Sequence, residues 1–133
     1  MPRLSPFAVA TTALAFAACG GSPDRQAGPE MISPAEARHE VSKTRGALNA
    51  ALATYRGGDA AAAQDQVADA YLQHFEEVEA PLGARDPALK ERLEEGIATG
   101  LRDSMNAGRP AAEVGRAVRR VLADLDRAEA ALR

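Results

Sequence analysis

The chain has 133 residues, enough for one domain and too few for a second, catalytic one. Hydrophobic residues make up 46% of it, yet aromatic residues make up only 4% and Trp is absent, a balance typical of Ala-rich helices. The formal net charge is -3, from 16 Lys and Arg against 19 Asp and Glu. This charge argues against nucleic acid as a partner, since non-specific binding to it needs a broad positive field. The single Cys excludes an internal disulfide and any cysteine-based zinc or haem-attachment motif.

The first eighteen residues have the pattern of a secretory signal peptide. Arg3 precedes a charge-free, largely apolar run from Phe7 to Ala18, which is shorter than the roughly twenty residues that a membrane-spanning helix needs. The small residues before Cys19 resemble a bacterial lipobox, with Phe16 at a position where Leu is usual. We therefore expect cleavage before Cys19, lipid attachment at Cys19, and anchoring to a membrane on the periplasmic side of the cell envelope. A secreted, soluble form with a free Cys is the alternative.

Residues 19–32 differ in composition from the rest of the chain. They contain Gly, Pro and Ser together with charges of both signs, and they show no periodic apolar face. This composition predicts a flexible tether between the lipid anchor and a folded body that comprises residues 33–133.

The folded body begins with two amphipathic helices. Ser33-Pro34-Ala35-Glu36 has the pattern of a reciprocal capping box and predicts a helix from Pro34 to about Arg56, where Gly57-Gly58 supplies a left-handed stop. Asp59 can cap the second helix. Pro81 lies near the end of that helix, where it is expected to kink or terminate it.

Two further helices complete the folded body. Asp86-Pro87 predicts the start of the third helix, which Asn106-Ala107-Gly108 ends, and the fourth begins at Pro110. Each of the four has an apolar stripe at helical spacing, and no strand pattern competes with them. The stripes predict a core made of Ala37, Val41, Leu48, Leu52, Tyr55, Val67, Tyr71, Phe75, Val78, Leu82, Leu89, Leu93, Ile97, Leu101, Met105, Val114, Val118, Val121, Leu125, Ala128 and Leu132. Because the connections are short, we expect an all-α, up-down-up-down four-helix bundle.

No catalytic motif is present. The chain has no recognisable Ser-His-Asp or Cys-His arrangement, and neither Gly20-Gly21 nor Gly57-Gly58 is placed like a phosphate-binding loop. We therefore expect a non-enzymatic protein.

A strip of acidic residues on the second helix is the candidate site. Glu76 and Glu79 lie about 60° apart on a regular helix, Asp65 and Asp69 extend the strip, and His74 lies on the other flank. Carboxylates that are close together repel one another, and their oxygens suit hard cations such as ferric iron, magnesium or calcium. The strip predicts a metal site made of Glu76, Glu79, His74 and Asp69. A solvated acidic face without a metal is the alternative.

Small residues recur every four positions on the third helix, at Gly96, Gly100 and Ser104. They leave a smooth row along which another backbone can approach closely. In a soluble bundle such a row is typical of a packing groove more often than of a dimer motif.

Between residues 50 and 132 the chain contains short motifs that helix composition alone does not explain. They are Tyr55-Arg56-Gly57-Gly58-Asp59, Asp69-Ala70-Tyr71-Leu72, Phe75-Glu76-x-Val78-Glu79-x-x-Leu82, Arg85-Asp86-Pro87-x-Leu89 and Gly108-x-Pro110. This region resembles the extracytoplasmic helical domain of bacterial high-affinity ferric-iron permeases. The resemblance implies a bundle fold and an iron-uptake context, and it matches Glu76 and Glu79 to the acidic pair of that family.

The transmembrane helices of those permeases, with their Arg-Glu-x-x-Glu motifs, are absent from this chain. We therefore expect a lipoprotein that captures ferric iron or another hard cation and delivers it to a partner such as an iron permease. The second hypothesis is a structural or docking module that binds a membrane protein of the envelope and no metal.

Overall fold

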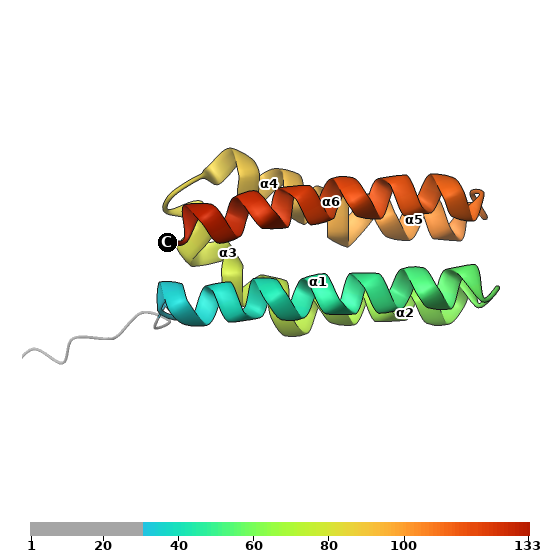
Figure 1. Cartoon of the computed structure of the whole chain (residues 1–133), viewed down its shortest axis with the longest axis horizontal. Coiled ribbons are helices and arrows are strands. Elements are labelled where there is room, and N and C mark those ends of the chain that lie inside the picture. The colour runs from blue at the N-terminus through green and yellow to red at the C-terminus, as the bar shows by residue number, and fades with distance from the viewer. Residues whose placement is uncertain (1–30) are drawn as a thin grey trace, which may run out of the picture.

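A computed structural model describes residues 31–133 of the chain. Within this range 85% of the residues are helical, there is no strand, and four helices form the fold (Figure 1). The expectation of an all-α fold is confirmed. The predicted signal peptide, Cys19 and all but the last two residues of the predicted tether lie outside the described residues.

The first and last helices are regular α-helices. Helix α1, Pro34–Arg56, begins with the predicted capping box: the Glu36 amide donates to the Ser33 hydroxyl, and the Ser33 amide donates to the Glu36 carboxylate. It ends at Gly57-Gly58, where Gly58 has a φ of 95°. Helix α6, Ala111–Ala131, starts directly after Pro110.

Each of the two middle helices contains a π-helical segment. The second helix is a continuous series of α2, η1 and α3, with bounds Ala60–Ala70, Tyr71–Phe75 and Glu76–Gly83. The third is a series of α4, η2 and α5, with bounds Pro87–Glu94, Glu95–Leu101 and Arg102–Asn106. The predicted caps Asp59 and Asp86 are confirmed, because each side chain accepts a backbone N–H of the first turn. Pro81 does not terminate its helix, which continues to Gly83.

The spacing of the apolar residues explains the π-helical segment of the third helix. In an α-helix a step of four residues overshoots a full turn by about 40°, so an apolar row spaced only by fours rotates away from the core. The third helix has such a row, Leu89, Leu93, Ile97, Leu101 and Met105, and all five side chains are nevertheless buried. Wider π turns remove the overshoot. In α6 the buried spacing alternates between four and three, and no π segment is needed.

The four helices pack around one apolar core. Helix α1 lies against α2 and α6, α2 contacts α5, α3 packs on α4, and α4 contacts α6 (Figure 1). The predicted core residues are all buried except Tyr55 and Tyr71, which are half-buried. None of the helices in residues 31–133 combines the length and the apolar composition that crossing a membrane requires.

Candidate functional site

The predicted site residues lie before, within and after the π turn η1, and they separate into two places. Glu79 on α3 faces α4, and its Oε1 accepts a hydrogen bond of 2.5 Å from the Tyr71 hydroxyl. Asp69 and His74 instead line a hollow beside α1. The extra residue in the η1 turn shifts the helix faces before it relative to those after it, so Asp69 and Glu79 do not continue one strip.

The first place is an acidic cluster that we define as Tyr71, Glu76, Glu79, Lys90 and Glu94. The pKa of Tyr71 is raised above that of an ordinary phenol, first by burial, then by the hydrogen bond to Glu79 and by the negative charges of Glu94 and Glu76. Glu94 comes from α4 and the other two carboxylates come from α3. Carboxylates of two helices therefore act on one phenol.

Lys90 supplies a positive charge to the acidic cluster. Its Nζ lies 2.7 Å from Oε2 of Glu94, and this hydrogen bond is the main reason why the pKa of Lys90 is raised. The charges of Glu79 and Glu91 raise it further. The Lys90 stem runs past Gly83, whose Cβ position would lie 3.9 Å from the Lys90 Cγ and Cδ. An ammonium group thus already neutralises part of the negative charge of the cluster.

The second place is the His74 hollow, with a volume of about 240 Å³ between α1 and the second helix. Its lining residues are Ala47, Ala50, Gln66, Asp69, Ala70, Gln73 and His74. The His74 Nδ1 lies 2.9 Å from Oε2 of Glu40. Hydrogen bonds from Lys43 first, and from His74 second, lower the pKa of Glu40 despite its partial burial. The buried Oε1 of Gln66 has no hydrogen-bond partner among the described residues.

The described residues contain no group of three or more His, Cys, Asp or Glu side chains arranged to hold a metal ion. Glu76 is exposed, whereas the carboxylates of Glu79 and Glu94 are engaged by Tyr71 and Lys90. To bind a cation, Glu79 and Glu94 would have to turn away from these two partners. Such an exchange of partners is chemically feasible, because a carboxylate that accepts one hydrogen bond still has free lone pairs on its oxygens. Hard cations prefer oxygen ligands of this kind.

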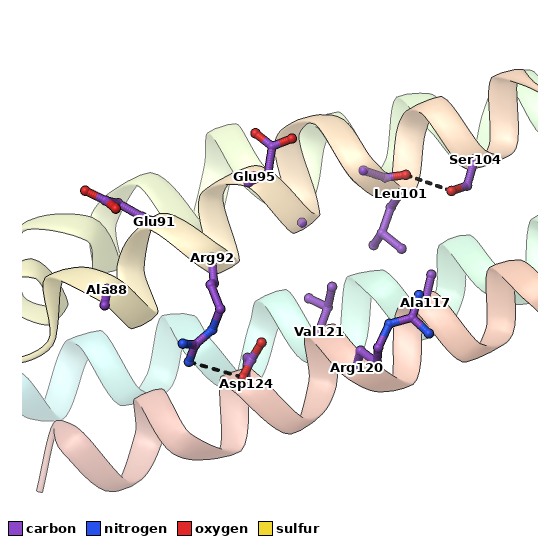
Figure 2. A pocket seen from close by; sticks show the side chains of 12 residues that line it. Ala88, Glu91, Arg92, Glu95, Leu101, Ser104, Ala117, Arg120, Val121 and Asp124 are labelled. Carbon is purple, nitrogen blue, oxygen red and sulfur yellow. Dashed lines mark hydrogen bonds and ion pairs between the residues drawn. The ribbon is translucent and has the colours of Figure 1, made fainter.

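The row of small residues on the third helix lines an open groove of about 700 Å³ against α6 (Figure 2). Gly96 is a packing contact, because a Cβ there would lie 3.1 Å from the Val121 Cγ2. Gly100 lies in the open part of the groove, and its carbonyl accepts a hydrogen bond from the Ser104 hydroxyl. Figure 2 shows Arg92 reaching across one end of the groove to Asp124, at 3.6 Å.

The sequence pattern does not predict that Tyr71, Lys90 and Glu94 contribute to the candidate site. The spacing of Tyr71 predicts a core residue. A half-buried tyrosine needs a partner for its hydroxyl, and the acidic residues that follow on the same helix were the available signal. No sequence spacing relates Glu94 to Glu79, since they are brought together only by the packing of α3 on α4.

No protein-family model, no curated protein and no solved structure matches this chain. The resemblance to the helical domain of ferric-iron permeases stays a prediction.

Proposed function

We propose that the chain is a non-enzymatic lipoprotein of the bacterial cell envelope, anchored through Cys19, that binds a hard cation weakly and takes part in iron uptake. Ferric iron is the favoured ion. The folded body is proposed to be an up-down-up-down bundle, because helices that follow one another in the chain pack together across short connections.

The acidic cluster is the observation that carries this proposal. The Tyr71 hydroxyl donates to Glu79, and the negative charges of Glu94 and Glu76 also raise its pKa, so carboxylates of the type that ferric iron prefers act on this phenol from two helices. A cation that replaced the Tyr71 proton and the Lys90 ammonium would be bound at the cost of two hydrogen bonds. This cost is the physical reason to expect weak binding.

Glu76 and Glu79 are the primary ligands in this proposal. Asp69 and His74 lie in the His74 hollow and remain secondary candidates, which Asp69→Asn and His74→Gln test separately. The ion would pass from the acidic cluster to a membrane partner such as an iron permease.

A cation titration of the mature chain tests the proposal. Ferric citrate, ferrous, manganous and zinc ions are added while heat and tyrosine emission are recorded, which is practical because the chain has no Trp. We expect Glu76→Gln/Glu79→Gln to weaken ferric binding at least tenfold. Asp65→Asn/Glu77→Gln removes the same charge from exposed positions and is expected to change little. Equal, weak responses of all three proteins to every ion would remove the cation-binding proposal.

Tyrosine variants identify the site of binding. Tyr71→Phe removes the hydroxyl of the acidic cluster, whereas Tyr55→Phe removes one that donates to the backbone carbonyl of Arg109. If the ion binds at the cluster, only Tyr71→Phe alters the ferric response of the emission. An unaltered response in Tyr71→Phe would place the ion elsewhere.

The groove favours the second candidate function, a docking module for a membrane protein of the envelope. It has an apolar floor with charged side chains on both edges, as protein-binding grooves often have. A Cβ at Gly100 would meet only the Glu95 carbonyl, at 3.5 Å, so Gly100→Leu is expected to fill the groove without disturbing the core. Loss of a cross-linked envelope partner in Gly100→Leu, with unchanged cation binding, would support this function. Specific ion uptake without any partner would count against it.

A further inference from the structure

The arginines in residues 31–133 divide into those that have a partner and those that have none. Seven form hydrogen bonds or ion pairs, namely Arg38, Arg45, Arg85, Arg92, Arg109, Arg127 and Arg133. Five form neither within this range, namely Arg56, Arg102, Arg116, Arg119 and Arg120. All five come from the last turn of α1, from α5 or from the first half of α6. The last turn of α1 and the first turn of α6 lie at the end of the bundle away from the chain termini of the folded part (Figure 1).

Two of these guanidinium groups converge over a glycine. Gly115 is a buried residue of α6, and a Cβ there would lie 3.2 Å from Nη2 of Arg56 and 3.6 Å from Nη1 of Arg119. The two nitrogens are therefore no farther apart than the sum of these distances, although they come from different helices. Like charges this close repel each other, and an anion between them would relieve the repulsion.

The carboxylates nearest in sequence have other partners. Glu113 lies 3.9 Å from Arg109, and the Asp59 carboxylate accepts the amide of Ala62 as the cap of α2. Neither forms an ion pair with Arg56 or Arg119. No carboxylate among the described residues forms an ion pair with Arg56 or Arg119.

We propose that Arg56 and Arg119 form a binding site for a phosphate group. One guanidinium fork is enough for the two oxygens of a carboxylate. Two forks that approach from different helices suit a tetrahedral phosphate group, whose oxygens point in different directions. Gly115 has a defined role in this site, because a Cβ there would crowd the Arg56 guanidinium, which would have to shift away from its place.

The phosphate group could belong to a free anion or to an anionic lipid headgroup, and two binding experiments separate these sources. The mature chain, prepared without lipidation, is titrated with inorganic phosphate in a calorimeter. It is also sedimented with vesicles of phosphatidylglycerol and, for comparison, of phosphatidylcholine. Saturable binding in the first experiment indicates a free anion. Binding only to phosphatidylglycerol vesicles indicates a headgroup, and either result supports the site if it depends on the two arginines.

Matched arginine variants test that dependence. We expect Arg56→Gln and Arg119→Gln each to weaken binding at least tenfold. Arg127→Gln and Arg133→Gln remove the same charge from arginines that are paired elsewhere, and they are expected to bind as the unaltered chain does. The proposal is overturned if neither probe binds, or if the two pairs of variants lose affinity equally.

A glycine pair tests the geometry independently of charge. Gly115→Ala places a Cβ against Arg56 and is expected to weaken binding severalfold, whereas Gly46→Ala adds a Cβ to α1 where nothing lies within 4 Å. Helicity and thermal unfolding of both variants are measured alongside. A folded Gly115→Ala protein with full affinity would contradict the arrangement over Gly115. If that variant does not fold, the arginine variants decide.

Discussion

The two ends of the bundle carry clusters of opposite charge, an acidic cluster at one end and an arginine pair at the other. A different irregularity of a helix accompanies each cluster. At one end, the π turn Tyr71–Phe75 lets Tyr71 reach Glu79 while Glu94 approaches from the neighbouring helix. At the other, two arginines from different helices approach the Cβ position of Gly115. Each charged cluster is thus associated with one backbone feature, the π turn η1 or Gly115. The two features can be altered separately by mutation.

The two ends also differ in their distance from the predicted tether. The first turn of α1 lies beside the end of α6, since Arg38 donates to the carbonyl of Leu132, and α3 and α4 are at this same end (Figure 1). Arg56 ends α1, and a helix of 23 residues is about 34 Å long. If Cys19 anchors the chain, the acidic cluster lies near the tether and the arginine pair lies far from it.

The largest expected effect comes from removing the aromatic ring that supports the acidic end. Phe75 is fully buried in η1, and its ring centroid lies 5.8 Å from that of Tyr71. We expect Phe75→Ala to lower the free energy of unfolding by about 3–5 kcal/mol, as measured by urea denaturation. Leu72 belongs to the same turn but is 57% exposed, so Leu72→Ala should cost less than about 0.5 kcal/mol.

Phe75→Leu sharpens this prediction, because it keeps an apolar side chain in the core while it removes the contact with the Tyr71 ring. We expect it to weaken cation binding and to leave phosphate binding unchanged. Equal losses at both ends would show that the two regions are not independent.

Removing the charge of Lys90 is expected to raise cation affinity about tenfold, whereas Phe75→Leu is expected to lower it. Lys90→Met removes the ammonium group that neutralises Glu94 but retains an unbranched stem beside Gly83. If a cation competes with Lys90 for the acidic cluster, the affinity of the chain for the cation should rise about tenfold in the calorimetric titration. Lys43→Met removes a cation that pairs with Glu40 instead and serves as the control. An unchanged ferric affinity in Lys90→Met would mean that the ion does not bind beside Glu94.

The helices and their ends could be predicted from the sequence because their signals are local. The capping box at Ser33, the caps Asp59 and Asp86, and the glycine stop after Arg56 depend on residues within one turn of each other. The π segments were missed, although the uninterrupted spacing by fours from Leu89 to Met105 is incompatible with a straight α-helix that keeps one face buried.

The side-chain clusters could be predicted only in part, because they depend on contacts between helices. Glu76 and Glu79 were found from their spacing, but the approach of Glu94 depends on how α3 packs on α4. No sequence pattern predicts the convergence of Arg56 and Arg119, since 63 positions separate them. A glycine within a helix, such as Gly115, usually indicates only lower helix stability.

The smallest expected effect is a pH dependence at the acidic end. Burial and the neighbouring carboxylates raise the pKa of Tyr71 in the folded chain above its value of about 10 in the unfolded chain. Above pH 10 the unfolded chain therefore loses this proton before the folded chain does. The contribution of Tyr71 to stability is complete below pH 10 and declines as the pH rises further.

Urea unfolding at successive pH values from 8 to about 11 measures this decline. Other groups also titrate in this range, so the comparison is between Tyr71→Phe and the unaltered chain. Tyr71→Phe should lose less stability over the interval, because it has no phenol to ionise at this position. Parallel curves for the two proteins would mean that the Tyr71 hydroxyl is not held by Glu79 in solution. The acidic end would then be a solvated surface, and the arginine pair would be left as the only converging charged site of the two.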